Sequence, residues 1–301
     1  MVAPSPRLRA TLVGAVAILL WATLAVLTTV TTVPALQLMA MTFTVAAVAA
    51  MVMWLLRGDG VLRHFRLPVR VWALGLGGLF GYHALYFLAL KLAPPLEASL
   101  INYLWPLLIV LFAGLLPGER LRWFHLTGAA LGLAGTVVLV AGRGDVGFES
   151  VHALGYAAAF VAAFTWAAYS VLSRRFAAVP TDAIGAFCAA TALLSWAVHA
   201  LTESFVMPAD AVEWAVIAAL GLGPAGLAFF CWDRGVKRGD VRALGTLAYA
   251  TPLLSSLLLI VFGQGALTLP VALACALIVG GAIMGTGDLR RPSPTLPPSP
   301  P

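Results

Sequence analysis

The sequence predicts an all-α membrane protein of ten transmembrane helices, arranged as two five-helix repeats of inverted topology. Three observations predict this fold class. First, the chain of 301 residues is 61% hydrophobic and only 10% charged, with a mean hydropathy of +0.98, whereas a soluble domain carries about 25% charged residues. Second, its apolar residues form ten runs. Third, one proline-containing motif occurs in both halves of the chain.

Each of the ten runs has about the length that a hydrocarbon layer of roughly 30 Å requires of a helix. The first run follows Arg7 and Arg9 and resembles a signal peptide, but it lacks a convincing cleavage site and nine further runs follow, so we expect it to remain. Pro34 separates the first run from the second. The runs cover residues 10–31, 34–56, 71–91, 95–116, 123–141, 152–173, 183–202, 212–234, 241–263 and 268–287.

The charges outside the runs predict the orientation of the chain. If the N-terminus is cytoplasmic, every lysine and arginine except Lys91 and Arg143 falls on the cytoplasmic side. Short cytoplasmic loops carry such an excess of basic residues. We therefore expect both termini in the cytoplasm, and we interpret the net charge of +6 as a sign of topology and not of nucleic-acid binding.

An internal repeat predicts how the ten spans divide. The segment YLWPLL at 103–108 corresponds to YATPLL at 249–254, and at the same offset Lys91 corresponds to Lys237 and Gly135 to Gly281. Because each half has an odd number of spans, the second half is predicted to lie upside down relative to the first, with a ligand site between them. The predicted domains are residues 1–146, residues 147–289 and a disordered proline-rich tail at 290–301.

Pro106 and Pro252 lie inside the repeated spans and are the predicted hinges. A proline inside a helix removes one backbone hydrogen bond, and in hydrocarbon such a defect is tolerated only beside protein or a water-lined cavity. These two spans are therefore predicted to face the interior. Gly223 and Pro224 predict a further break in the eighth run.

Aromatic and polar residues gather at the predicted mid-depth of several spans. They predict a cavity with aromatic walls for a flat apolar group and with hydroxyls or amides for a polar group. The alternative is that these residues form belts at the headgroups or fill gaps between helices. The candidate substrate-binding residues are Trp21, Tyr82, His83, Tyr86, Asn102, Trp105, Trp166, Tyr169, Tyr249 and Ser255.

Ionisable residues in or beside the spans leave alternatives open. His83 lies within a span and is a functional candidate for that reason; it either gates, titrates or binds a substrate carboxylate, or is a neutral imidazole bonded to a hydroxyl. Lys91 and Glu97 flank the Pro94–Pro95 turn. They form either a surface ion pair of little energetic value or, with Lys237 as the inner counterpart of Lys91, a means of attracting an anionic ligand.

The sequence predicts neither an enzyme nor a bound metal or cofactor. Cys188, Cys231 and Cys275 all lie in apolar runs without the spacing of metal ligands. The chain contains no HExxH motif, no paired intramembrane aspartates and no recognisable Ser/His protease pattern.

Ten spans, basic inner loops and the matching prolines Pro106 and Pro252 make residues 8–288 resemble the EamA branch of the drug/metabolite transporter superfamily. Within it the chain most resembles the bacterial YddG-type aromatic amino acid exporters. The resemblance implies a basket of helices around a central cavity lined by spans one, three, four, six, eight and nine. It also implies a multi-pass protein of the bacterial inner membrane that exports aromatic and other neutral amino acids by alternating access.

The energetics and the substrate leave a second interpretation. Because no acid stands out at mid-span, we expect facilitated diffusion by a monomer, although Glu97 and His83 keep proton coupling open. The alternative is a proton-coupled exporter of other small metabolites or drugs in the same superfamily. A cationic multidrug pump is disfavoured because span one has no acid, and a phosphate-ester carrier because the spans offer only Lys91 and Lys237 as cations.

Overall fold

The computed structural model describes residues 5–117, 121–142 and 144–287, and every regular element within them is a helix. The tail predicted at 290–301 and the charge of Arg143 lie outside the described residues. Nine of the described helical segments are long and apolar enough to cross a membrane. The predicted all-α, multi-pass membrane protein is therefore confirmed at this level.

The helical segments coincide with the ten predicted runs. The tenth run forms one helix of 17 residues, shorter than the other nine segments. The nine longer segments are Pro6–Thr28, Ala35–Leu56, Val69–Leu92, Pro95–Ala113, Trp123–Ala141, Ser150–Phe176, Ala183–Thr202, Ala211–Arg238 and Val241–Val261.

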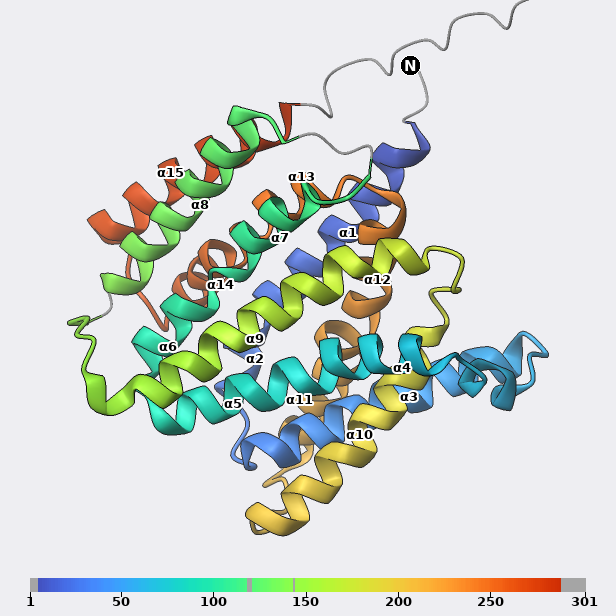
Figure 1. Cartoon of the computed structure of the whole chain (residues 1–301). Coiled ribbons are helices and arrows are strands. Elements are labelled where there is room, and N and C mark those ends of the chain that lie inside the picture. The colour runs from blue at the N-terminus through green and yellow to red at the C-terminus, as the bar shows by residue number, and fades with distance from the viewer. Residues whose placement is uncertain (1–4, 118–120, 143, 288–301) are drawn as a thin grey trace, which may run out of the picture.

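Several of these segments consist of more than one helix (Figure 1). The α-helices are α1 (Pro6–Ala22), α2 (Leu24–Thr28), α3 (Ala35–Leu56), α4 (Val69–Leu76), α5 (Tyr82–Leu92), α6 (Pro95–Asn102), α7 (Trp105–Ala113), α8 (Trp123–Ala141), α9 (Ala153–Leu172), α10 (Ala183–Thr202), α11 (Ala211–Leu222), α12 (Ala228–Arg238), α13 (Val241–Leu247), α14 (Ala250–Val261) and α15 (Leu269–Gly285). The 3₁₀ and π elements are η1 (Val61–Phe65), η2 (Gly77–Gly81), η3 (Ser150–His152), η4 (Ser173–Phe176) and η5 (Gly223–Leu227).

The two spans that contain the repeated proline motif are interrupted at corresponding places. α6 ends at Asn102 before α7 begins at Trp105, and α13 ends at Leu247 before α14 begins at Ala250. Pro106 and Pro252 each lie in the first turn of the second helix, where the missing N–H has no partner within the helix to lose. The predicted interruptions therefore exist, and each lies just before its proline.

Spans three and eight each contain a π-helix, η2 and η5, again at corresponding places in the two repeats. A π-helix is a local widening of the α-helical ladder and is frequent at functional sites. The break at Gly223 and Pro224 was expected from the sequence, whereas the π-helix at Gly77–Gly81 was not.

The packing of the spans follows the two-repeat architecture. α3 packs along α10 and α8 along α15, so that spans two and five each contact their own counterparts (Figure 1). α1 packs along α12, and α5 along α9, so that span one contacts span eight and span three contacts span six. Exchanging the two repeats maps these last two pairs onto each other, as expected for a pseudo-two-fold axis.

Small residues allow the closest of these contacts. A Cβ atom added to Gly128 of α8 would lie 2.6 Å from the backbone nitrogen of Gly285 in α15, a distance that real Cβ contacts do not show. Glycines four residues apart, Gly128 and Gly132 in α8 and Gly281 and Gly285 in α15, therefore allow these two helices to pack closely within the chain, as in other membrane bundles.

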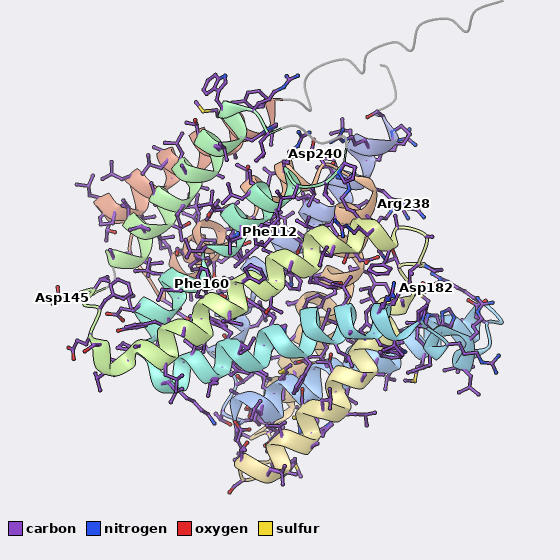
Figure 2. All side chains as sticks on the ribbon, in the orientation of Figure 1. Phe112, Asp145, Phe160, Asp182, Arg238 and Asp240 are labelled. Carbon is purple, nitrogen blue, oxygen red and sulfur yellow. The ribbon has the colours of Figure 1, made fainter. Side chains whose placement is uncertain are left out.

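The two ends of the helical bundle differ in charge. We call the end that holds Arg7, Asp240 and the start of α1 the basic end, and the end that holds Glu97, Glu203 and the start of α6 the acidic end. Figure 2 shows Arg238, Asp240 and Asp182 on the side of the basic end and Asp145 on the opposite side.

Candidate functional site

A cavity of about 600 Å³ lies between the two repeats. The first repeat contributes spans one to four to its walls. The second repeat contributes span six, α11, η5 and α12 of span eight, and α14 of span nine. This volume is within the range of about 300–1,000 Å³ that is usual for small-molecule sites.

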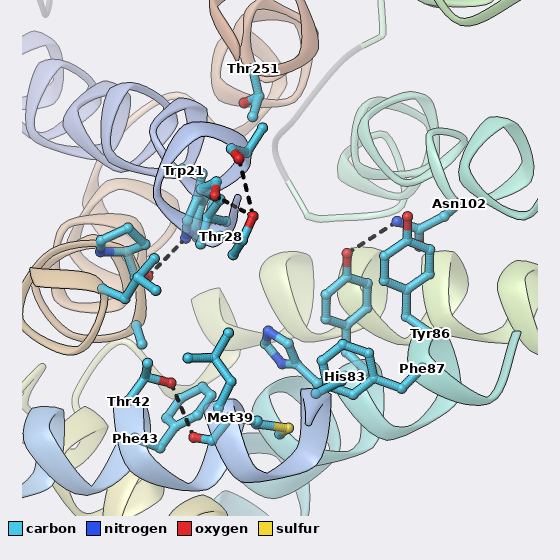
Figure 3. A pocket seen from close by; sticks show the side chains of 18 of the residues that line it. Trp21, Thr28, Met39, Thr42, Phe43, His83, Tyr86, Phe87, Asn102 and Thr251 are labelled. Carbon is cyan, nitrogen blue, oxygen red and sulfur yellow. Dashed lines mark hydrogen bonds between the residues drawn. The ribbon is translucent and has the colours of Figure 1, made fainter. Parts of the chain in front are cut away.

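Most of the predicted site residues meet in this cavity. The predicted residues that line it are Trp21, Tyr82, His83, Tyr86, Asn102, Trp105, Trp166 and Ser255. Figure 3 shows Trp21 from span one facing His83, Tyr86 and Asn102 from spans three and four across the open centre. The structure thus brings together residues far apart in the sequence; whether they bind substrate stays a prediction.

Tyr169 and Tyr249, by contrast, are not cavity-lining residues. Tyr169 is 3% exposed and packs on Gly78, where an added Cβ would lie 2.3 Å from the tyrosine ring. Tyr249 is 0% exposed and packs on Gly132 of α8 in the same way. These two tyrosines therefore support the cavity from behind its walls, and we do not include them in the binding site proposed below.

Sequence reasoning missed the contribution of span two. Met39, Thr42 and Phe43 of α3 line the cavity, and their i, i+3, i+4 spacing places them on one helical face. That spacing is the signal that would have found them. Phe229 of α12 and Thr251 of α14 also line the cavity.

The cavity walls are aromatic and polar but uncharged. None of the described residues that line the cavity is an aspartate, glutamate, lysine or arginine. Asn102 Nδ2 donates to Tyr82 Oη at 3.1 Å, and Trp21 Nε1 donates to the carbonyl of Pro224 at 3.1 Å (Figure 3). Asn102 Oδ1 and Thr251 Oγ1 are buried without a hydrogen-bond partner, so these two oxygens lie inside the wall and are not exposed to the cavity.

Four tryptophans close the cavity toward the basic end. The ring of Trp166 lies 5.6 Å from that of Trp21, 6.3 Å from that of Trp105 and 6.1 Å from that of Trp232. Trp232 is 0% exposed, lies one helical turn beyond the lining residue Phe229, and donates from Nε1 to Ser170 Oγ at 3.0 Å. These side chains form an aromatic floor contributed by α1, α7, α9 and α12.

An ionic cluster around the buried carboxylate of Asp240, which we call the Asp240 network, lies beyond this floor at the basic end. Arg7 Nη2 of α1 donates to Asp240 Oδ2 at 2.8 Å, and Arg242 Nη2 donates to the same oxygen at 3.4 Å. The amide of Asp240 donates to Thr11 Oγ1 at 2.8 Å. Burial alone would raise the pKa of Asp240, but the guanidinium groups of Arg7 and Arg242 and the amide of Ala243 outweigh burial and hold that pKa below its usual value. The network ties span one to the start of span nine.

The cavity reaches the protein surface at the acidic end. Its lining extends to Thr28 of α2 and to Thr31 and Val33 in the connection to α3, and Thr28 is exposed. The cavity is therefore accessible from the acidic end and closed toward the basic end.

The two repeat-related lysines do not face the cavity. Lys237 is buried and lies 2.9 Å from Asp233 Oδ1, and it also donates to the carbonyl of Val179 at 3.0 Å. Glu97 is 4% exposed and accepts from the amide of Gly147 at 3.0 Å, so it is not part of a surface ion pair with Lys91. The intramembrane acid Asp233, which also accepts from Thr181 Oγ1 at 2.7 Å, was not found from the sequence.

No metal site is visible in the described ranges: they hold no group of three or more histidine, cysteine, aspartate or glutamate side chains placed to share an ion. Cys188, Cys231 and Cys275 are free cysteines.

The model of the EamA-like transporter family matches residues 8–141 and 153–286, one copy in each half of the chain. The resemblance to this family predicted from the sequence is therefore confirmed.

Two relatives and one solved structure are especially similar. The aromatic amino acid exporter YddG of Ancylobacter novellus is 55% identical over 287 residues, which are 95% of this chain and 99% of that protein. The aromatic amino acid exporter YddG of Escherichia coli K12 is 28% identical over 204 residues, 65% of this chain and 68% of that protein. A protein solved by crystallography is 53% identical and superposes with a TM-score of 0.90 over 94% of this chain and 98% of its own.

Proposed function

The chain belongs to the EamA-like transporter family, and from that premise we propose that it exports aromatic and other neutral amino acids across the bacterial inner membrane. The observation that carries this proposal is the cavity between the repeats. Its aromatic walls suit a flat apolar side chain, its polar lining residues, such as Thr42, His83 and Ser255, suit the polar end of an amino acid, and the absence of charged residues from its described lining suits a substrate without net charge.

Alternating access is the mechanism that this architecture favours. The two repeats supply equivalent broken spans and equivalent π-helices, so each repeat can adopt the conformation of the other and open the cavity to the opposite side. The described conformation is open at the acidic end and closed by the aromatic floor and the Asp240 network. In our proposal the basic end is cytoplasmic, so this is an outward-open state.

This mechanism requires ten spans in two inverted repeats with both termini in the cytoplasm. α15 is the tenth span in this proposal: its 17 residues give a length of about 25 Å, close to the hydrocarbon thickness. The observation in favour of this topology is that successive loops along the chain are alternately rich and poor in lysine and arginine.

We expect the protein to act as a transporter without enzymatic activity or cofactor, and as a monomer. All walls of the cavity belong to one chain, so a single copy holds a complete site. Because no acid is among the described residues that line the cavity, we expect facilitated diffusion of the substrate down its gradient.

One observation favours a second candidate, the proton-coupled exporter. Asp233 is 2% exposed within span eight, where an ionisable residue is a candidate proton carrier. The side chain of its partner Lys237 is also buried. Because the desolvation of two buried charges offsets much of their attraction, a contribution to stability alone does not explain this ion pair. Proton coupling would proceed through this pair, outside the cavity.

Transport by the purified chain in proteoliposomes tests both candidates. We expect uptake of labelled phenylalanine, tryptophan and threonine that stops at equal concentrations and does not change when a pH gradient is imposed. Folded protein that transports none of the twenty amino acids would contradict the proposed function. Accumulation against the amino acid gradient, driven by pH and lost in Asp233→Asn, would replace facilitated diffusion by proton coupling.

A further inference from the structure

We infer that Nε2 of His83 accepts a hydrogen bond from the α-ammonium group of the transported amino acid, and that the cavity thereby distinguishes amino acids from the corresponding 2-oxo acids. The inference rests on the proposed function and specifies which atom of the same site reads the substrate's amino group.

The hydrogen-bond partner of His83 sets the position of the hydrogen on its imidazole. Nδ1 of His83 lies 2.6 Å from the carbonyl oxygen of Leu79. A carbonyl oxygen only accepts, so the hydrogen is on Nδ1, and a neutral ring then has its lone pair on Nε2. No acidic side chain lines the described cavity to balance an imidazolium charge, which favours the neutral ring. The partner is a carbonyl and not the hydroxyl considered from the sequence.

The imidazole of His83 is part of the cavity wall. His83 lines the cavity, and Figure 3 shows its ring in the open centre between Phe43 and Tyr86. The hydrogen bonds among the described residues include one for Nδ1 and none for Nε2, although the ring is only partly buried. Nε2 is therefore an acceptor that faces the cavity and lacks a protein donor.

Neighbouring aromatic rings hold the imidazole of His83 in place. The imidazole is 5.6 Å from the ring of Phe43 at an interplanar angle of 81°, and 5.0 Å from the ring of Tyr82 at 77°. Phe229 contacts it from α12 at 6.1 Å. A side chain packed by rings from α3, α5 and α12 and bonded to the backbone presents its free nitrogen in one direction.

The lone pair on Nε2 selects for a ligand group that donates a hydrogen bond. An acceptor requires a donor, and an amino acid offers three N–H donors on its ammonium group. The same group is a cation, and the faces of the neighbouring aromatic rings attract cations. A carboxylate or a 2-oxo group has only lone pairs, which a neutral Nε2 repels. His83 therefore cannot bind the substrate carboxylate, which was one of the roles considered for it from the sequence.

Equilibrium binding to the full chain in detergent tests the inference through the fluorescence of the cavity tryptophans. The probes are L-phenylalanine, phenethylamine (no carboxylate), 3-phenylpropionate (no ammonium) and phenylpyruvate (2-oxo acid). In the unaltered protein we expect phenylalanine and phenethylamine to bind at least about tenfold more tightly than the other two, as one hydrogen bond to a charged group allows. Equal affinity for all four probes would overturn the inference.

Substitutions then assign the effect to one nitrogen. We expect His83→Leu to weaken phenylalanine and phenethylamine about tenfold and to leave 3-phenylpropionate unchanged, whereas His83→Gln, which keeps an acceptor oxygen, restores part of the loss. The matched control is Phe87→Leu, one turn further along α5 on the same cavity wall; it should weaken all four probes by a similar factor. Unchanged phenylalanine binding in a folded His83→Leu protein would overturn the inference.

The inference and the proposed function fail differently. If the unaltered protein transports no amino acid in liposomes, the proposed function fails. If it transports phenylalanine, but 3-phenylpropionate competes as well as phenylalanine does, the proposed function stands and the role of His83 fails.

Discussion

The hydroxyl of Tyr249 accepts a hydrogen bond from the backbone amide of Leu107 at 3.1 Å. Tyr249 lies at the interruption of span nine, and Leu107 directly follows Pro106 at the interruption of span four. In a continuous helix the amide of Leu107 would donate to a carbonyl four residues earlier. The bond therefore compensates the break in one repeat with a side chain from the other.

Tyr249→Phe should lower stability without abolishing ligand binding. The change removes the acceptor and leaves a buried amide without a partner, which costs about 1–3 kcal/mol. We expect a lower thermal unfolding midpoint in detergent and unchanged affinity for phenylalanine, because Tyr249 is not a cavity-lining residue. Tyr156→Phe is the matched control, because the Tyr156 hydroxyl accepts a longer, exposed bond of 3.4 Å. Loss of binding at an unchanged midpoint would contradict this role.

Asp240→Asn should open the basic end. Asparagine caps a helix as well as aspartate does, so the start of α13 stays capped while the charge that holds Arg7 and Arg242 is lost. Ala17 of α1 is 0% exposed and lies one helical turn from Trp21, toward the basic end. We expect a cysteine introduced by Ala17→Cys, in a chain without other cysteines, to react faster with a polar thiol reagent added at the basic end. Asp182→Asn, which removes an exposed ion pair to Arg57 at 3.4 Å, should not change that rate. Equal rates in all three proteins would exclude the Asp240 network as a closure.

Glu203 makes stability depend on acid pH. Burial alone would raise its pKa, but the hydrogen bond with His199 and those from the amides of Leu36 and Gln37 outweigh it, and the pKa lies below the usual value. A carboxyl whose pKa falls on folding stabilises the fold above its unfolded pKa and loses that effect as pH falls through the folded pKa. Glu203→Gln should therefore lower the unfolding midpoint at neutral pH, and the difference from the unaltered protein should shrink only below about pH 4.3.

The exposed residue Glu149 supplies the control for this pH series. Glu149→Gln should leave the unfolding midpoint within error at every pH. A Glu203→Gln protein whose midpoint matches that of the unaltered protein at pH 7 would show that the carboxylate does not stabilise the start of α3.

Much of the fold followed from the sequence because a membrane imposes simple rules. Span length follows from the hydrocarbon thickness, and Pro106 and Pro252 revealed the paired interruptions. The π-helix at Gly77–Gly81 did not follow, because glycines permit many backbone geometries and specify none. Asp233 was missed because a charge near the end of a span is usually solvated. Here Asp233 is buried and instead forms an ion pair with Lys237 and accepts a hydrogen bond from Thr181.

Repeat-related residues do not have the same surroundings at Tyr249. Its counterpart Tyr103 lines the cavity, whereas Tyr249 packs on Gly132 behind it. The two repeats have similar sequences at this point, but the cavity is open toward one end only. Equivalent residues therefore have different surroundings. The sequence pattern does not predict which conformation each repeat adopts.

Trp105→Ala should reduce the transport of large substrates more than that of small ones. The Trp105 ring lines the cavity and contacts Trp166 and Trp232 at 6.3 Å and 6.0 Å, and an aromatic contact adds about 0.5–1.5 kcal/mol. We expect tryptophan uptake in proteoliposomes to fall severalfold and threonine uptake to fall less, with Trp105→Phe close to the unaltered protein. Equal losses for both substrates would argue against a lining role.

Pro106→Ala tests whether the interruption of span four is a hinge. Proline at this position cannot donate to the carbonyl of Asn102, whereas alanine can, and this bond would join α6 and α7 into a more continuous helix. A stiffer span should slow the exchange of labelled phenylalanine across liposomes while equilibrium binding is retained, because Pro106 does not line the cavity. The matched control is Pro270→Ala, since Pro270 occupies the same second position of α15 in a span without an interruption; its exchange rate should not change. If Pro106→Ala exchanges substrate as fast as Pro270→Ala does, the interruption is a fixed feature of the cavity wall, and the movement between the two states takes place elsewhere.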